Sequence, residues 1–405
     1  MKFPKILAMI GDSMQDWLSF YDLFSGCGGM TAGFVKAGFK ILGGLDINKS
    51  AVDTYKHNFP DAIFTRLGSI EDKVLIDSLY REINPAGVIG GAPCQSISLA
   101  GNRDALERRC YYFLDFLDFV KSKKPLFFVF ENVKAFKNMR IVDPNLINLN
   151  NMEILDKELQ LALRQHRRLK DLNRFASQRE LSKPERDELD SLLVTNITID
   201  KSKLVSLKDT FLHRAMEIGY KVTWGVLNAT GFGSGQSRER FISIGFRNDL
   251  AIEPVLPRPS NNPKTAQDII GDLEDVVEAF IPNHDFTKHA DFQVKRMDAL
   301  KCGERIYKNY SDAWRRLFPD RPCFTIKENH GGTHVHYKFP RVLTPREMAR
   351  FQGFDDSFVF LGSKSEIMKM ISNGVDLNMS KAIADSVKEQ LCFLKDNGVI
   401  NDERN

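Results

Sequence analysis

The sequence predicts an α/β fold in which a mostly parallel sheet carries helices on both faces. The first observation is a set of short, apolar, strand-like segments at 20–24, 40–45, 86–90 and 126–130. The second is that helix-like segments alternate with them, at 30–37 and from Asp46 to Tyr55. The continuous apolar run at 126–130 is typical of a strand buried on both faces. Strands and helices that alternate in this way predict a doubly wound domain.

Between 136 and 206 the sequence changes character, and we expect a charged helical insertion there. Residues 156–193 are helix-forming, heavily charged and nearly free of glycine, and we expect Pro184 to divide them into a helical hairpin. Acidic and basic residues nearly balance, which favours a solvated insertion over a DNA-binding arm. Strand-like segments resume after the insertion, at 220–227 and 241–246.

A proline-rich stretch at 254–263 marks a further boundary in the chain. The residues that follow, to about 340, have an irregular pattern. Their second half, 291–340, carries ten Lys or Arg against six Asp or Glu. The sequence therefore predicts a locally basic region at this place.

Composition bounds the class of protein. The chain has 405 residues, of which 42% are hydrophobic and 27% charged, so it is long enough to bury a core without disulfides. A net charge of +4 excludes a polycation, and any nucleic acid must meet a local basic surface. The six cysteines form no CxxC pair, and no long apolar segment occurs. We expect reduced thiols, no signal peptide, no membrane segment and a cytoplasmic location.

A glycine-rich turn after the first strand is the first candidate site. It reads Phe24-Ser-Gly-Cys-Gly-Gly29 and leads into a helix. Glycines let a backbone approach a ligand closely, and Asp46, about twenty residues on, suits two ribose hydroxyls. The spacing is not GxGxxG, so a nucleoside cofactor is favoured over a dinucleotide, and a purely structural turn is the alternative.

Two further candidates follow the next strands. Cys94 comes directly after the strand at 86–90, where open α/β sheets bind ligands, and a thiol there can act as a nucleophile. Its alternative is a buried structural cysteine. Glu131 ends the strand at 126–130, where burial can raise the pKa of a carboxyl so that it serves as an acid. Its alternative is an ion pair or a helix N-terminal acid.

The fourth candidate is an alternating motif before residue 241. Period-two alternation puts Gln236, Arg238 and Arg240 on one face of a strand. Two arginines and an amide suit a carbonyl, carboxylate or phosphate, although exposed edge arginines would look the same. The histidines at 330–336 lack partners at ligand spacing, so we expect a DNA-facing or structural loop and no metal site.

Taken in this order, the motifs resemble those of the DNA (cytosine-5)-methyltransferases. The similar stretches are 24–29, 93–95, 131–133 and 236–240, with a late helical motif at 341–354 and a final cofactor motif at 372–375. The resemblance covers roughly 19–135 and 207–392. It implies a Rossmann-like catalytic domain at 19–135, 207–250 and 341–395, the insertion at 136–206, and a smaller target-recognition domain at 251–340.

The resemblance implies S-adenosylmethionine as the cofactor. Phe24 would stack on adenine, the turn would hold the methionine end, Asp46 would bind the ribose hydroxyls, and Asn373 and Val375 would close the pocket. The full set of implied cofactor-binding residues is Phe24, Ser25, Gly26, Gly28, Gly29, Asp46, Ile47, Ile70, Pro93, Tyr112, Asn373 and Val375.

The resemblance also implies the chemistry and the partner. Cys94 would attack C6 of a cytosine flipped out of double-stranded DNA, Glu131 would hold the base edge, and Arg238 and Arg240 would steady its carbonyl, the carboxylate and a phosphate. The implied DNA-contacting residues are Gln95, Ser98, Arg103 and Gln236. A modification enzyme of this kind would act as a monomer and often beside a cognate restriction endonuclease.

The chain departs from the family pattern at several positions, namely Ser69, Cys110, Tyr112, Asp355 and Asp376. Asp376 replaces a proline in the final motif. These departures remove no catalytic group but predict weaker cofactor binding. The alternative functions are a transfer-RNA cytosine-5 methyltransferase and a catalytically weak DNA-binding regulator. The long variable region favours DNA over transfer RNA, although a Cys323-Phe-Thr triplet typical of the RNA-acting branch is present.

Overall fold

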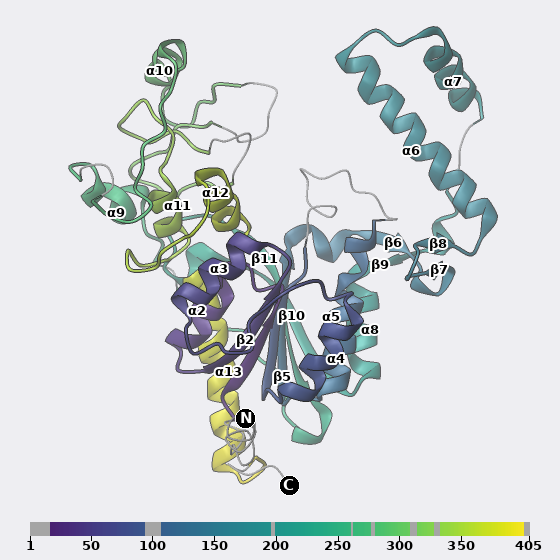
Figure 1. The fold of residues 1–405 in the computed structure, drawn as a ribbon, viewed down its shortest axis with the longest axis vertical. Helices are drawn as coiled ribbons and strands as arrows, with labels where there is room; N and C mark the ends of the chain where they lie inside the picture. The colour runs from purple at the N-terminus through teal and green to yellow at the C-terminus, as the bar shows by residue number, and fades with distance from the viewer. Residues whose placement is uncertain are drawn as a thin grey trace, which may run out of the picture. The chain divides into compact units, whose positions relative to one another are not determined.

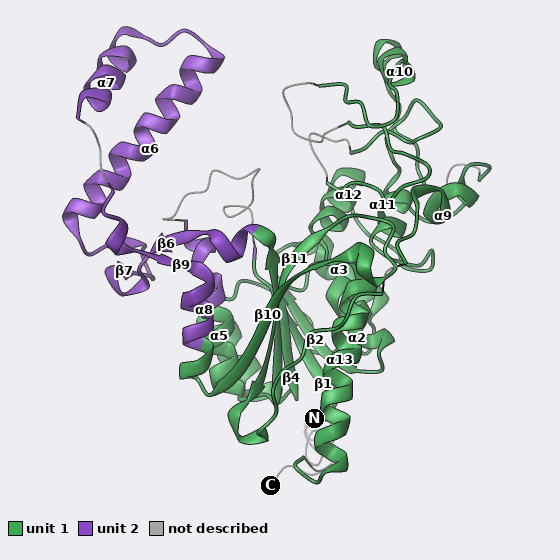
Figure 2. Cartoon of the chain, turned by 180° about the vertical axis from the view of Figure 1, so that it is seen from behind, with its two compact units in different colours: residues 1–92, 115–134, 215–405 green, residues 93–114, 135–214 purple. Residues whose placement is uncertain are grey.

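The computed structural model describes residues 17–93, 107–195, 199–260, 262–276, 280–307, 314–327 and 333–400. The chain divides into two compact units (Figure 2). The first comprises residues 1–92, 115–134 and 215–405, and the second comprises residues 93–114 and 135–214. The predicted insertion at 136–206 lies within the second unit, which also takes in the segments 93–114 and 207–214.

A seven-stranded sheet forms the centre of the first unit, in the order β10-β11-β5-β4-β1-β2-β3. Its strands are β1 (Ser19–Leu23), β2 (Lys40–Asp46), β3 (Arg66–Leu67), β4 (Gly87–Gly91), β5 (Phe127–Val133), β10 (Tyr220–Asn228) and β11 (Glu239–Arg247). The five strands from β3 to β5 run parallel, and β11 is antiparallel to both β5 and β10. The predicted α/β class and all six predicted strands are confirmed.

Helices cover both faces of this sheet (Figure 1). One face carries α2 (Gly29–Lys36), α3 (Lys49–Asn58) and α13 (Leu377–Asp396), and the other carries α4 (Lys73–Glu82) and α5 (Tyr112–Lys123). The core between the sheet and α13 is rich in phenylalanine, since Phe20, Phe34, Phe39 and Phe127 pack as rings 5.1–6.4 Å apart. Aromatic pairs of this kind add to the free energy of apolar burial.

After β11 the first unit continues with short helices separated by irregular segments. These helices are α9 (Ala266–Ile270), α10 (Asp291–Asp298), α11 (Pro345–Phe351) and α12 (Lys364–Asn373). The irregular pattern expected between 251 and 340 is confirmed in the described residues, where short helices and isolated bridges occur. No helix in the described part of the chain is long and apolar enough to cross a membrane.

The second unit contains the predicted helical hairpin. Helix α6 (Lys157–Gln178) and helix α7 (Lys183–Val194) are separated by four residues, and Pro184 stands in the first turn of α7, where its missing N–H costs nothing. Short strand pairs join β6 (Arg140–Val142) to β9 (Leu204–Ser206) and β7 (Ile147–Asn148) to β8 (Glu153–Ile154). Helix α8 (Leu207–Glu217) begins in this unit and ends in the first. The sequence predicted the hairpin but not these strands.

Candidate active site

The candidate site lies at the carboxyl ends of β1 and β4, where the strand order of the sheet reverses. From β1 the chain proceeds to β2 on one side, whereas β4 and β5 lie on the other. Open α/β sheets bind ligands at such a switch point because the loops after the two strands diverge and leave a crevice. The glycine-rich turn follows β1, and Ala92-Pro93 follows β4.

The glycine-rich turn is fastened to Asp46 at the end of β2. The backbone N–H of Gly26 donates to Asp46 Oδ2 at 2.9 Å, and the N–H of Asn48 donates to Oδ1 at 2.8 Å. The Ser25 N–H donates to the Leu45 carbonyl at 3.0 Å. Burial raises the pKa of Asp46, while the Asn48 and Gly26 N–H groups lower it. Asp46 thus stands beside the turn, as the sequence predicted, with carboxylate oxygens that can accept further hydrogen bonds.

The turn has the features of a ligand cradle. The buried Ser25 Oγ has no hydrogen-bond partner among the described residues. Gly26 has φ +54°, and no described atom lies within 4 Å of the place where a Cβ would stand. Phe24 is only partly buried and also has a positive φ, of 60°. A donor-bearing turn, an open space, an unsatisfied hydroxyl and a neighbouring carboxylate fit a ligand with hydroxyl and amino-acid groups such as S-adenosylmethionine.

The final motif lies against this turn. A Cβ at Gly29 would stand 2.6 Å from the carbonyl oxygen of Val375, so only glycine permits this approach. Val375 is buried, and Asn373, the last residue of α12, is exposed. The structure therefore brings 372–375 to the glycine turn across more than 340 residues of sequence, as predicted.

The other predicted cofactor residues have different settings. Ile47 is 72% exposed beside Asp46, and Ile70 is half-buried after β3. Pro93 and Tyr112 belong to the second unit, where the Arg108 guanidinium stacks 5.1 Å from the centre of the Tyr112 ring. Gly28 precedes α2 with φ +94°.

Glu131 and Arg240 form a buried ion pair on adjacent strands. Arg240 Nε lies 2.9 Å from Glu131 Oε1, and the two side chains are 13% and 10% exposed. Gly91 pairs with Glu131 in register, and a Cβ there would meet Glu131 Oε2 at 2.8 Å. Burial raises the pKa of Glu131, whereas Arg240 and Arg238 lower it. The arrangement places a carboxyl with a raised pKa next to the end of β4, the strand that leads to Cys94.

Arg238 has a setting that differs from the expected catalytic one. It shares a buried face with Gln236 and Arg240, as the alternation predicted, while Ser237 and Glu239 are exposed. Its guanidinium is 1% exposed and donates to the carbonyls of Ile326 (3.2 Å), Ser372 (2.7 Å) and Gly374 (2.8 Å). These carbonyls take hydrogen bonds from Nη1 and Nη2, the two groups at the tip of the side chain that was expected to reach a base or a phosphate.

Gln236 also differs from its prediction, because it is 0% exposed and no surface is open to DNA there. Its Nε2 donates to the Phe351 carbonyl at 2.9 Å and to Gln352 Oε1 at 2.8 Å, and its Oε1 accepts the Ile326 N–H at 3.2 Å. In this structure the side chain of Gln236 makes contacts within the protein, and its DNA contact stays a prediction. The segment around Ile326 and the final motif cover the face of the strand on which Gln236 lies.

Asp376 lies beside the site but was not among the residues predicted for it. It is 0% exposed, although it appeared only as a departure from the family pattern. Its Oδ2 accepts from Ser234 Oγ at 2.6 Å and from Gln236 Nε2 at 3.3 Å, and its Oδ1 accepts the Met379 N–H at 3.0 Å. An aspartate before a helix-forming run is a typical N-cap, and that signal was available in the sequence.

Four predicted residues lie outside the described part of the chain. They are the candidate nucleophile Cys94 and the candidate DNA contacts Gln95, Ser98 and Arg103. Their roles stay predictions. In sequence, Cys94 follows β4 by three residues.

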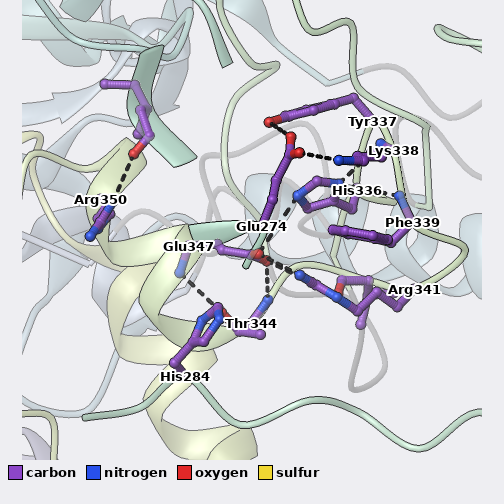
Figure 3. Close-up of polar contacts among 12 residues, drawn as sticks. Glu274, His284, His336, Tyr337, Lys338, Phe339, Arg341, Thr344, Glu347 and Arg350 are labelled. Carbon is purple, nitrogen blue, oxygen red and sulfur yellow. Dashed lines mark hydrogen bonds and ion pairs between the residues drawn. The ribbon is translucent and has the colours of Figure 1, made fainter. Parts of the chain in front are cut away.

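A second buried polar cluster joins α11 to the segment 336–341 (Figure 3). Glu347 is fully buried and accepts two hydrogen bonds from Arg341, at 2.7 and 2.8 Å, and one from the Thr344 N–H at 2.8 Å. His336 Nδ1 accepts the Lys338 N–H at 3.0 Å, and burial lowers the pKa of His336 to about 4. His336 is therefore neutral at pH 7 and holds the backbone of Lys338, whereas residues 330–332 lie outside the described part of the chain. The described residues contain no group of three His, Cys, Asp or Glu that could hold a metal ion.

Comparison with known proteins gives consistent matches. The model of the C-5 cytosine-specific DNA methylase family matches residues 18–155 and 197–389 and omits the stretch that contains α6 and α7. The type II methyltransferase M1.HphI of Haemophilus parahaemolyticus is 29% identical over 391 residues, which cover 91% of this chain and 86% of that protein. The type II methyltransferase M.NgoPII of Neisseria gonorrhoeae is 27% identical over 400 residues, which cover 92% and 96%.

A solved structure supports the same assignment of fold. A candidate DNA modification methyltransferase encoded within an E. coli prophage has a TM-score of 0.64 at 20% identity and covers 92% of this chain and 99% of its own. The likeness, together with the sheet order, confirms the predicted Rossmann-like methyltransferase fold.

Proposed function

The chain belongs to the C-5 cytosine-specific DNA methylase family, and we propose that it methylates C5 of a flipped-out cytosine in a specific double-stranded DNA sequence. It is a DNA methyltransferase of the kind found in restriction–modification systems. We further propose a cognate restriction endonuclease in the same system and a site of action in the cytoplasm, where prokaryotic DNA lies.

The proposed chemistry begins at Cys94. C5 of cytosine is too electron-poor to take a methyl cation directly, so the thiolate adds to C6 and makes C5 a nucleophile. After methylation, the C5 proton is lost to a base, the C6–S bond breaks, and Cys94 leaves as the thiolate. A cytosine inside a duplex is out of reach of these groups, which requires that the base be flipped out.

Glu131 and Arg240 would handle the charge that develops on the base. Protonated Glu131 donates to N3 as the thiolate adds, and its second oxygen accepts from the exocyclic amine. Arg240 Nε holds this carboxyl in place through its 2.9 Å contact with Oε1, which is a hydrogen bond when Glu131 is protonated, and its remaining N–H groups can turn toward O2 of the base. A raised pKa serves this role because it keeps a proton on Glu131 at a higher pH.

Asp46 and the turn from Phe24 to Gly29 would hold the cofactor. S-adenosylmethionine supplies, when bound, an electrophilic methyl group. Asp46 would accept from the ribose hydroxyls, Ser25 Oγ and the turn would take the methionine end, and Phe24 would stack on adenine. Val375 and Asn373 would close the pocket from the far end of the chain.

The observation that carries the proposal is the buried Glu131–Arg240 pair beside Gly91. Glu131 lies on β5 opposite Gly91, the last residue of β4, and β4 leads to Cys94. The glycine turn proposed to hold the cofactor follows β1, the strand next to β4 in the same sheet. A buried carboxyl–guanidinium pair facing such an edge suits recognition of the polar rim of a base better than stability alone, because burying an ion pair rarely adds net stability.

The test is transfer of a tritiated methyl group from S-adenosylmethionine to DNA and, in parallel, to transfer RNA. Wild type is expected to label DNA, and Cys94→Ala is expected to label neither substrate. Label in transfer RNA alone would favour the RNA-acting alternative. Label in neither nucleic acid would favour the alternative of a catalytically weak DNA-binding regulator. Bisulfite sequencing of a host that expresses the protein would then read out the recognition sequence.

A further inference from the structure

The loop from Ser372 to Asp376 connects α12 to α13 and lies against the glycine turn. Val375 approaches Gly29 so closely that a Cβ there would be 2.6 Å from the Val375 carbonyl oxygen and 3.2 Å from its nitrogen. A displacement of this loop by a few tenths of an ångström would therefore change one wall of the proposed cofactor pocket. What fixes the loop is a question that the family pattern does not answer, since this chain has Asp376 where a proline is usual.

Asp376 fixes the end of this loop through three donors, one in α13 and two in the stretch that precedes β11. Its Oδ1 caps α13 by accepting the Met379 N–H at 3.0 Å. Its Oδ2 accepts from Ser234 Oγ at 2.6 Å and from Gln236 Nε2 at 3.3 Å. Because the carboxylate is 0% exposed, water cannot substitute for these donors, and each contact constrains the loop.

Arg238 fixes the beginning of the loop from the same direction. Its Nη2 donates to the carbonyls of Ser372 and Gly374, at 2.7 and 2.8 Å. Gln352 Nε2 adds a hydrogen bond to the Ile371 carbonyl at 2.8 Å. The stretch 234–238, which precedes β11, thus holds both ends of the loop, and Asp376 is its only acidic partner among the hydrogen bonds that the structure describes for that stretch.

We propose that Asp376 is a positioning residue for the cofactor: together with Ser234 and Arg238 it holds Val375 against Gly29, and so replaces by hydrogen bonds the stiffness that a proline gives other family members. The proposal rests on the proposed function, because it concerns the same cofactor site. The departure at Asp376 was expected to weaken cofactor binding. Under this proposal the aspartate instead supports cofactor binding, because it holds one wall of the pocket in place.

Asp376→Pro is the sharpest variant, because it restores the residue that is usual in the family. The backbone at Asp376 has φ −62° and ψ 125°, values close to polyproline II that proline adopts readily. The variant therefore keeps the path of the chain while it removes the acceptors of Ser234, Gln236 and the Met379 N–H. A reading based on the family pattern alone expects unchanged or tighter cofactor binding, whereas our proposal expects weaker binding.

The experiment measures the Kd of purified full-length protein for S-adenosylmethionine by calorimetry, without DNA, and then KM and kcat for both substrates. We expect Asp376→Pro to raise the Kd and the KM for S-adenosylmethionine about tenfold, the effect of losing one well-made hydrogen bond. The KM for DNA is expected to stay within about twofold. Asp376→Asn keeps the cap on α13 and one partner in Ser234, so a Kd within about threefold of wild type is expected.

Asp156→Ala is the matched control. Asp156 caps α6 by accepting the Leu159 N–H at 2.9 Å, in the insertion that the family model omits. Asp156→Ala should lower the melting temperature and leave the Kd for S-adenosylmethionine unchanged. The control therefore distinguishes the loss of a helix cap from the loss of a residue that positions the pocket wall.

Several outcomes overturn the proposal. It falls if Asp376→Pro binds S-adenosylmethionine within twofold of wild type, or if Asp156→Ala weakens binding as much. If Asp376→Pro does not fold, Ser234→Ala decides, with a severalfold weaker Kd expected and an unchanged Kd contrary to the proposal. Failure of wild type to bind S-adenosylmethionine would refute the proposed function and this inference with it, whereas a normal Kd in Asp376→Pro would refute this inference alone.

Discussion

Two arginine-containing regions of the molecule use the same side chain in opposite ways. In the first unit, Arg238 is 1% exposed and donates to three backbone carbonyls from segments far apart in sequence. In the helical hairpin of the second unit, Arg168 pairs with Glu188 through 2.6 and 2.8 Å contacts, yet both side chains are more than 40% exposed.

The difference shows that contact length is a poor guide to energetic importance. The hairpin pair is short but solvated, so water replaces either partner at little cost. The contacts of Arg238 are no shorter, but the arginine itself is buried, and its acceptors, which are buried or partly buried, would lose this donor. The family model matches the region around Arg238 and omits the hairpin, as expected if only the former serves the shared chemistry.

The largest effect is expected for Arg238→Met, which removes the guanidinium and keeps most of the apolar volume. Three carbonyls, one buried and two partly buried, lose the donor Arg238, so we expect a loss of about 3 kcal/mol in the free energy of unfolding. Urea denaturation at pH 7 measures it. A loss below about 1 kcal/mol would mean that buried and exposed arginines are equivalent here, against the comparison.

The next effect is expected for Arg240→Leu, which leaves Glu131 buried without its cation. Because Arg240 lowers the pKa of Glu131, its removal should raise that pKa further. A step that needs protonated Glu131 slows as the pH rises through this pKa, so the alkaline fall of the rate should move to higher pH while the maximal rate drops.

The pH–rate profile of methyl transfer under saturating S-adenosylmethionine measures this shift. Arg240→Lys keeps a cation and should move the profile less. An alkaline limb that stays in place in Arg240→Leu would show that Glu131 is not the acid.

A smaller effect concerns Asp22 in β1, whose pKa burial raises to about 8. Thr31 Oγ1 donates to its Oδ2 at 2.6 Å. Between pH 4 and 8 the folded protein keeps this proton and the unfolded chain has lost it, so a rise in pH across this range favours unfolding. Asp22→Asn keeps an acceptor for Thr31 and removes this dependence.

Melting temperatures of wild type and Asp22→Asn between pH 6 and 8.5 check the point. The gain from the substitution should grow toward pH 8 and then level off. A constant difference across that range would contradict a buried, protonated Asp22.

The smallest effect is expected for Arg168→Met in the hairpin. Both partners of its ion pair are solvated, so the melting temperature should change by less than about 1 °C. Scanning calorimetry beside Arg238→Met makes this a matched pair of identical substitutions. A comparable loss in both would remove the distinction between the two regions.

The sequence predicted most of the fold, for a physical reason. Strands buried on both faces must be apolar throughout, so segments such as 126–130 stand out, and a glycine turn after a strand marks the ligand edge of the sheet. The two-residue β3 and the short strands of the second unit were missed, because two or three residues carry no periodicity.

The site was predictable in part. Alternation correctly put Gln236, Arg238 and Arg240 on one face, but period two does not say what covers that face. The covering segments, Ile326 and the loop before α13, lie about 90 and 135 residues away in sequence. Two side chains expected at a substrate therefore hold the backbone together, and Asp376 gains its role from the same contacts.

Covalent trapping on duplex DNA of random sequence that contains 5-fluorocytosine is the sharpest test of the proposed role of Cys94. The fluorine cannot leave as a cation, so methylation at C5 should arrest the enzyme with Cys94 bonded to C6. In the presence of S-adenosylmethionine, wild type is expected to form a protein–DNA adduct that survives denaturing gel electrophoresis, and Cys94→Ala is expected to form none. An adduct in Cys94→Ala, or none in a wild type that methylates ordinary DNA, would contradict the account.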